Sequence, residues 1–285
     1  MNLPSATLLA QSVVGGVFTG ALYGLLGLGL SLSWGLLHQI NLAQFGLAFA
    51  SAYLTYDLSA RAGINPLWAL LLLPPLFFAI GAALQWTIQR FRVTPLNSLL
   101  LSFGLTIIIE AALQWVWTAD YRRLESDLGQ GKLRAFGLFF PYPELLTLGL
   151  SVAAALAVWT MFRVTDIGRA MRAAAQDTPM AAAFGIDAQR LSLGLAGLTT
   201  ALASLAGVCI AFSYTLAPSQ IYAWIGVVFA CAMMGGLGRP LGPLLAGIAI
   251  GVAEALTMAL TAPAWAPLVS FAGLIVVLLA RPGRA

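Results

Sequence analysis

Charged side chains are scarce in this sequence of 285 residues. Asp, Glu, Lys and Arg make up 8% of it, against about 25% in an ordinary soluble domain. So few charges cannot cover the surface of a 29.9 kDa globule, which excludes a soluble enzyme. The mean hydropathy of +0.92 also excludes disorder, because disorder needs low hydrophobicity and high charge. An integral membrane protein with several spans remains.

Residues that carry chemistry are equally few. His38 is the only histidine, so the chain lacks the material for a His-rich metal site or a histidine relay. Lys132 is the only lysine, and neither a G-x-x-x-x-G-K-[ST] phosphate loop nor a G-x-S-x-G elbow is present. The net charge of +4 is too small to indicate nucleic acid. We expect no catalytic residue, no metal and no cofactor, and no enzyme activity in this chain.

Long uncharged runs predict the fold. A hydrocarbon core of ~30 Å takes ~20 apolar residues as a helix. The runs are too long for barrel strands and do not alternate in polarity. We therefore predict an all-α polytopic membrane protein of about eight to ten transmembrane helices, forming one permease domain over residues 1–285. We count nine spans, near 8–33, 40–58, 62–89, 96–118 and 142–162, with two in 191–238 and two in 240–280. Segments 34–41 and 222–238 are alternatively re-entrant.

The placement of Lys and Arg predicts the orientation. If the polar loop 163–190 is cytoplasmic, nine basic residues lie inside and five outside. This bias favours an external N-terminus and an internal C-terminus. The polar loop 119–141 is then outside, although it is basic.

The loop 163–190 carries the signals of ordered structure. Arg169, Arg172 and Gln176 lie at positions i, i+3 and i+7, which places them on one polar face of a short helix. Such a helix would lie near the membrane surface. One interpretation is a passive amphipathic tether between two spans; the other is a docking element.

A second short helix is predicted directly after the first. Asp177 or Thr178 can cap its N-terminus, with Pro179 in its first turn. Gly185 is expected to adopt a left-handed conformation past its end. Asp187 can then cap the next span.

Two stretches of this loop, Gly168–Asp177 and Ala181–Ile186, resemble the cytoplasmic loop of ABC-importer permeases of the branched-chain amino acid family. In that family the loop is the coupling helix, which docks in a groove of the ATPase. The resemblance implies ATPase contacts for Arg169, Arg172, Ala175, Gln176, Asp177, Ala182, Gly185 and Ile186.

Further segments resemble the same family in the same order. They are Gly35–Gln44, Pro95–Leu96 with Leu101–Thr106, Gly235–Gly238 with Gly242–Pro243, Glu254–Leu256, and Arg281–Pro282. Departures occur at Gln44, where the family commonly has His, at Phe45, where it often has Gly, and at Arg239-Pro240 after the glycine turn. These departures cluster near the pathway that the resemblance implies, so they bear on the substrate.

Polar groups and glycines within the apolar runs are candidates for the translocation path. The candidates are Asn41, Gln44, Glu110, Gly235, Gly236 and Gly238. Asn41 and Gln44 would share a face if that stretch is helical. The alternative role for each polar residue is an interhelical hydrogen bond. For Glu254 we favour this structural role.

Two further patterns concern packing. Small residues four apart let helix backbones approach closely, and the spacing occurs at Gly16, Gly20, Gly24, Gly247 and Gly251. Tyr214 and Tyr222 lie with Pro218 near the expected outer turn. They predict an aromatic belt at the membrane interface; the alternative is contact with a substrate.

The resemblance implies a permease subunit of an ABC importer in the bacterial cytoplasmic (inner) membrane. Its partners would be a second, homologous or identical permease, two ABC ATPase subunits, a soluble substrate-binding protein and the lipid bilayer. The cargo would be branched-chain or other neutral amino acids, or alternatively urea or short amides. A different class stays open on the residues alone: a proton-coupled secondary transporter using Glu110 and Glu254.

Overall fold

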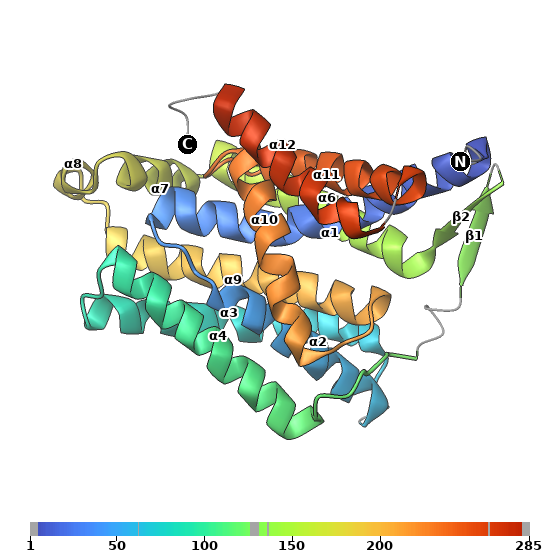
Figure 1. The fold of residues 1–285 in the computed structure, drawn as a ribbon. Helices are drawn as coiled ribbons and strands as arrows, with labels where there is room; N and C mark the ends of the chain where they lie inside the picture. Colours follow the sequence, from blue (N-terminus) through green and yellow to red (C-terminus); the bar gives the residue numbers. More distant parts are fainter. Residues whose placement is uncertain (1–4, 62, 126–130, 136, 262, 281–285) are drawn as a thin grey trace.

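The computed structural model describes residues 5–61, 63–125, 131–135, 137–261 and 263–280. Within these ranges the chain is mostly helical (Figure 1). The helices are α1 (Ala6–Leu37), α2 (Ala43–Ala60), α3 (Ala69–Arg90), α4 (Pro95–Trp117), α6 (Tyr142–Val164), α7 (Asp166–Gln176), α8 (Thr178–Ala183), α9 (Ala188–Ser213), α10 (Ile221–Gly235), α11 (Gly242–Leu260) and α12 (Ala266–Ala280). Short 3-10 turns precede three of them: η1 (Pro66–Trp68), η2 (Pro218–Gln220) and η3 (Pro263–Trp265).

Seven helices in the described part of the chain are long and apolar enough to cross a membrane. They are α1, α3 with η1, α4, α6, α9, α10 with η2, and α11. The helix α2 has 18 residues, and α12 contains a shorter apolar stretch, Leu268–Val277. Seven is fewer than the nine spans predicted; the other two predicted spans fall on α2 and α12, which are not among the seven. The all-α polytopic fold is therefore confirmed.

Two boundaries differ from the sequence prediction. The first span does not end at residue 33, because α1 continues to Leu37, where His38 ends it with a left-handed φ of 54°. The segment 34–41 is thus the end of α1 and a link, and it is not a separate re-entrant helix. The second span begins at Ala43, later than the predicted residue 40.

The helices run between two ends of the molecule (Figure 1). One end carries α7 and α8, and we call it the inner end. The opposite end carries the beginning of α1 and a hairpin of β1 (Lys132–Ala135) and β2 (Leu138–Pro141), and we call it the outer end. This separation agrees with the predicted placement of the loops 163–190 and 119–141 on opposite sides.

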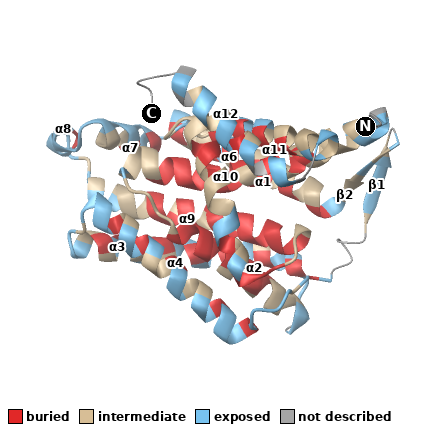
Figure 2. Cartoon of the chain, viewed as in Figure 1, coloured by how far each residue is buried: buried red, intermediate tan, exposed pale blue. Residues whose placement is uncertain are grey.

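The centre of the bundle is formed by α1, α2 and α9 (Figure 2). Most of the apolar stretch of α9, 83% of it, is buried, whereas only 17% is buried in α4. Large apolar side chains of α4 such as Leu100 and Ile108 are exposed, as expected for a helix whose outer surface contacts lipid. The helix α4 is therefore peripheral.

Close packing of α1 on α11 confirms the role predicted for the glycine row. A Cβ atom built on Gly16 would lie 2.6 Å from the carbonyl oxygen of Gly251, and one on Gly20 would lie 2.4 Å from that of Gly247. Gly24 meets the Cα atom of Leu244 in the same way, at 2.7 Å. The two backbones are thus in contact, which only glycine permits at these positions.

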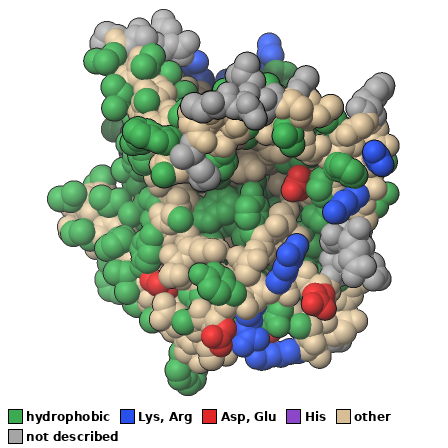
Figure 3. Space-filling model, turned by 45° about the vertical axis from the view of Figure 1, so that its right-hand side comes forward, with side chains coloured by type: hydrophobic (Ala, Val, Ile, Leu, Met, Phe, Trp, Pro, Cys, Tyr) green, Lys and Arg blue, Asp and Glu red, His purple; other side chains and the backbone are tan. Residues whose placement is uncertain are grey.

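The outer end contains a small β element that the sequence predicted only as part of a polar loop. The strands β1 and β2 pair antiparallel. The side chain of Gln11 donates to the carbonyl of Phe139 and accepts from its N–H, both at 2.9 Å, so the hairpin is fixed to α1. Viewed with this side turned forward, the surface is hollowed near its centre and the hollow is lined by hydrophobic side chains (Figure 3).

Candidate functional site

The inner-end segment α7–α8 has the local structure that the sequence predicts. Thr165 caps α7, accepting from the N–H of Gly168 at 3.1 Å. Asp177 breaks the helix and caps α8, accepting from the N–H of Met180 at 2.9 Å. Gly185 follows with a left-handed φ of +81°. The two short helices are therefore confirmed, and each has a defined end.

A close turn brings α7 back against the end of α6. Gly168 is buried, and a Cβ atom there would lie 2.4 Å from the Cα atom of Phe162. Met171 is buried as well, so it anchors the inward face of α7. The polar side chains predicted on the other face, Arg169, Arg172 and Gln176, are exposed.

The far side of this segment presents apolar side chains to solvent. Met180 is 57% exposed and Phe184 is 80% exposed. Ala182, between them in sequence, is exposed too. We call Met180, Ala182 and Phe184 the apolar tip. Ala175 and Ile186 lie at half-buried positions, whereas Asp177 and Gly185 are exposed.

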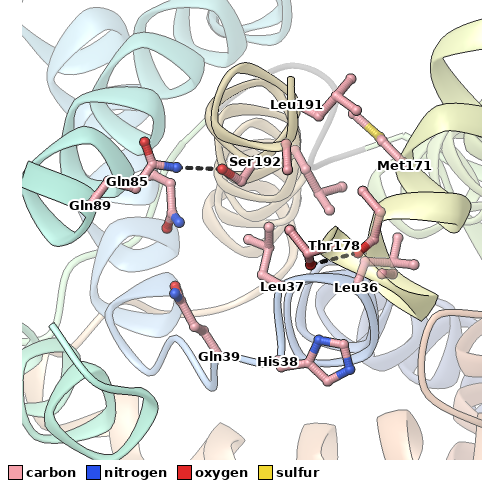
Figure 4. Close-up of a pocket in the computed structure, with 14 residues that line it drawn as sticks. Leu36, Leu37, His38, Gln39, Gln85, Gln89, Met171, Thr178, Leu191 and Ser192 are labelled. Atoms are coloured by element: carbon pink, nitrogen blue, oxygen red, sulfur yellow. Dashed lines mark hydrogen bonds between the residues drawn. The ribbon is translucent and has the colours of Figure 1, made fainter. Parts of the chain in front are cut away.

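A cavity of about 230 Å³ lies between this segment and the helical bundle (Figure 4). Its walls come from the end of α1, from α3, from α7 and α8, and from the start of α9. Gln89 of α3 donates to the hydroxyl of Ser192 on α9. Gln85 and Gln39 point into the same space from α3 and from the link after α1 (Figure 4). The segment therefore rests over a polar, partly open space.

The candidate path residues near α2 have different environments. Gln44 is 1% exposed, and its amide donates to the carbonyl oxygen of Leu26 at 2.8 Å. This contact joins α2 to α1, which favours the interhelical alternative for Gln44. Asn41 is half-buried and precedes the first residue of α2, Ala43, so the two residues do not share a helical face.

The candidate glycines form a tight turn between α10 and α11. Gly236 and Gly238 have φ values of +88° and +73°. Ser31 of α1 holds the turn, because its hydroxyl donates to the carbonyl of Gly236 at 3.1 Å and its own carbonyl accepts from the N–H of Gly238 at 3.0 Å. Gly235 packs directly against the backbone of Gly242. These contacts require glycine at these positions whether or not the turn lines a translocation path.

The two intramembrane glutamates differ in exposure. Glu254 on α11 is 6% exposed and accepts from the hydroxyl of Tyr23 at 3.2 Å and from that of Ser270. It joins three helices, in agreement with the structural role we favoured. Glu110 on α4 is half-buried and accepts from Tyr222 at 2.6 Å and from Gln114 at 3.0 Å.

The residues of the predicted aromatic belt differ in exposure. Tyr214 packs edge-on against Trp224, which itself packs edge-on against Tyr23. Pro218 is buried. Of the three predicted belt residues only Tyr222 is exposed, at 38%, and its hydroxyl donates to Glu110. Tyr214 is half-buried, and a place for these residues in the membrane interface stays a prediction.

The structure combines long apolar helices with a pair of short helices packed at one end and with polar clusters inside the membrane part. Together these features define a multi-pass membrane permease. Residues 12–278 match the family described as branched-chain amino acid transport system / permease component. The chain therefore belongs to this family, and it is a multi-pass protein of the inner membrane.

Curated relatives agree over nearly the whole chain. The high-affinity branched-chain amino acid transport system permease protein LivH of Salmonella typhimurium is 28% identical, over 95% of this chain and 93% of the relative. The corresponding permease BraD of Pseudomonas aeruginosa is 24% identical, over 95% and 94%. A probable LivH of Methanocaldococcus jannaschii is 26% identical, over 85% and 79%. No solved structure matches the chain.

Proposed function

We propose that the chain is the permease subunit of an ABC importer that moves branched-chain or other neutral amino acids. A separate pair of ATPase subunits drives it, a second permease completes the path, and a soluble binding protein delivers the cargo at the outer end. The names of the relatives support the amino acid class. The family favours this reading over a proton-coupled secondary transporter.

The observation that carries the proposal is the apolar tip on a capped, anchored segment. A passive tether has no need of defined helix ends, nor of Phe184 held 80% exposed in water. Burying such side chains against a partner releases roughly 25 cal/mol per Å² of apolar surface. The tip would enter a groove of the ATPase, and Arg169, Arg172 and Gln176 would form its polar rim.

Force would reach the membrane part through the same segment. Met171 and the Gly168 turn connect α7 to the bundle, and Asp187 caps α9 directly after α8, accepting from the N–H groups of Gln189 and Arg190 at 3.1 Å. A movement of the tip would therefore displace the beginning of α9. Since α9 is the most buried of the seven apolar helices, its displacement would rearrange the centre of the bundle.

The test is a substitution that changes the backbone conformation after α8 and leaves the three side chains of the apolar tip unchanged. A Cβ atom on Gly185 meets nothing within 4 Å, so Gly185→Val acts only through its left-handed φ, which β-branched residues resist. We expect uptake and substrate-stimulated ATP hydrolysis to be lost in proteoliposomes, while the subunit inserts and accumulates normally.

The matched control is Gly63→Val at the outer end. Gly63 also has a left-handed φ, +64°, and open space around a Cβ atom. Gly63→Val should therefore couple normally. Normal coupling in Gly185→Val, together with normal coupling in Ala182→Glu, would refute the docking role of this segment.

A further inference from the structure

A polar stripe runs along the peripheral helix α4. Its members recur every four residues: Ser98, Ser102, Thr106, Glu110 and Gln114. Four residues turn an α-helix by about 400°, so the stripe advances around the helix by about 40° at each step. The first three members are buried, Glu110 is half-buried and Gln114 is exposed. The stripe therefore leaves the packed face of α4 and reaches the open face at Glu110.

The inner part of the stripe has packing partners within the chain. The Ser102 hydroxyl accepts from the N–H of Leu42 at 3.1 Å and lies 3.3 Å from the carbonyl of Ile40, which joins α4 to the link before α2. The hydroxyl of Thr106 donates to the carbonyl of Ser102. Structural roles thus account for these residues, but they do not account for a carboxylate further along.

Glu110 is held in place by donors from two helices. Gln114, one turn later on α4, donates to Oε1 at 3.0 Å, and Tyr222 at the start of α10 donates to Oε2 at 2.6 Å. Each carboxylate oxygen therefore has one neutral donor. No Lys, Arg or His forms a salt bridge with Glu110 among the residues that the structure describes, so the carboxyl group has no cationic partner there.

The depth of Glu110 makes the missing cationic partner significant. It lies seven residues before the outer end of α4 at Trp117, which corresponds to about 10 Å along the helix. A carboxylate at that depth is costly against lipid, and such groups mark ion or substrate pathways. In Figure 1, α10 crosses the near face of the bundle steeply, and η2 at its beginning contacts α4.

We propose that Glu110, with Tyr222 and Gln114 as positioning residues, receives the ammonium group of a zwitterionic amino acid in the outer half of the path. This inference rests on the proposed function and specifies its substrate contact. The argument is charge complementarity: a carboxylate with two neutral donors and free lone pairs accepts from a primary ammonium. A cationic side chain of the second permease is the competing occupant.

The experiment separates the effect of the charge of residue 110 from the effect of its side-chain shape, in the full importer complex. Uptake of radiolabelled leucine is measured in proteoliposomes with the loaded binding protein at saturating concentration, so that its affinity does not limit the rate. Glu110→Gln keeps the shape and removes the charge, and we expect the uptake rate to fall roughly tenfold or more, as for the loss of a charge-assisted hydrogen bond. Glu110→Asp keeps the charge and should retain more uptake than Glu110→Gln.

The matched control removes an acidic charge elsewhere. Glu125 is exposed in the outer loop, and Glu125→Gln should transport normally. Tyr222→Phe should lower uptake less than Glu110→Gln, and the combination of both should add little, because Tyr222 acts only through the carboxylate. Basal ATP hydrolysis should be unchanged in Glu125→Gln.

Two results would overturn the inference. One is uptake by Glu110→Gln equal to that of the unaltered importer. The other is failure of Glu110→Gln to associate with the second permease, which would make a cation of that subunit the occupant. If the unaltered complex transports no amino acid at all, the proposed function fails instead, so the two failures are distinguishable.

Discussion

The contact between α1 and α11 predicts a large difference between two neighbouring glycines. Gly20→Ala places a Cβ atom 2.4 Å from the carbonyl oxygen of Gly247 and 2.6 Å from the Cα atom of Ile248. Ordinary contact begins at 3.4 Å, and the atoms encountered are backbone that cannot rotate away. The two helices must therefore separate by about 1 Å, which also loosens the Gly16–Gly251 contact.

The expected cost of Gly20→Ala is about 1–3 kcal/mol, the usual range for overpacking. Gly20→Leu should cost more, because the whole side chain must be accommodated. Gly15 is the matched control: it lies on the same helix, and a Cβ atom there meets nothing within 4 Å. Gly15→Ala should be neutral or should stabilise by up to about 1 kcal/mol through helix propensity.

The assay is equilibrium unfolding of the purified subunit in mixed detergent micelles, followed by intrinsic fluorescence. Each variant is compared with the unaltered protein under the same conditions. If Gly20→Ala and Gly15→Ala unfold at the same denaturant concentration, the close approach of α1 and α11 is not a source of stability and the reasoning is refuted.

Two further predictions concern orientation and capping. Cysteine introduced at Glu125 should react with an impermeant thiol reagent in intact cells, and cysteine introduced at Thr178 should not. The native Cys209 and Cys231 are buried and give little background. Labelling at Thr178 alone would show that the orientation is the reverse of the predicted one. Asp187→Ala removes the acceptor for two N–H groups at the start of α9 and should lower the free energy of unfolding by about 1 kcal/mol, whereas Asp187→Asn should largely preserve it.

Ser126, in the middle of the predicted outer loop, would be the first choice for the external label. It lies outside the residues that the structure describes, so Glu125 takes its place.

Features that depend on neighbouring residues were predictable from the sequence. Asp177, Pro179 and Gly185 form a start and stop signal within nine residues, and the structure confirms α8 between them. The glycine spacing of α1 likewise requires only the helical repeat. The functional roles of these elements, including the coupling contacts, stay predictions that the experiments above address.

Features that depend on distant partners were not predictable. Glu110 is bonded to Tyr222, which is 112 positions away, and nothing in either neighbourhood signals the pairing. The hairpin of β1 and β2 depends on Gln11, 128 positions from Phe139. Tyr214 was expected in the membrane interface because aromatic residues often lie there, but nothing near it in the sequence signals its contact with Trp224.

The pairing of α1 with α11 has a consequence for biogenesis. The glycine face of α1 is complementary to a helix that is synthesised about 230 residues later. At roughly 5–20 residues per second, α1 waits on the order of 10–50 s before that partner exists. During this interval the glycine surface must be held by lipid or by the insertion machinery, and a chain that ends before α11 would leave that surface uncovered.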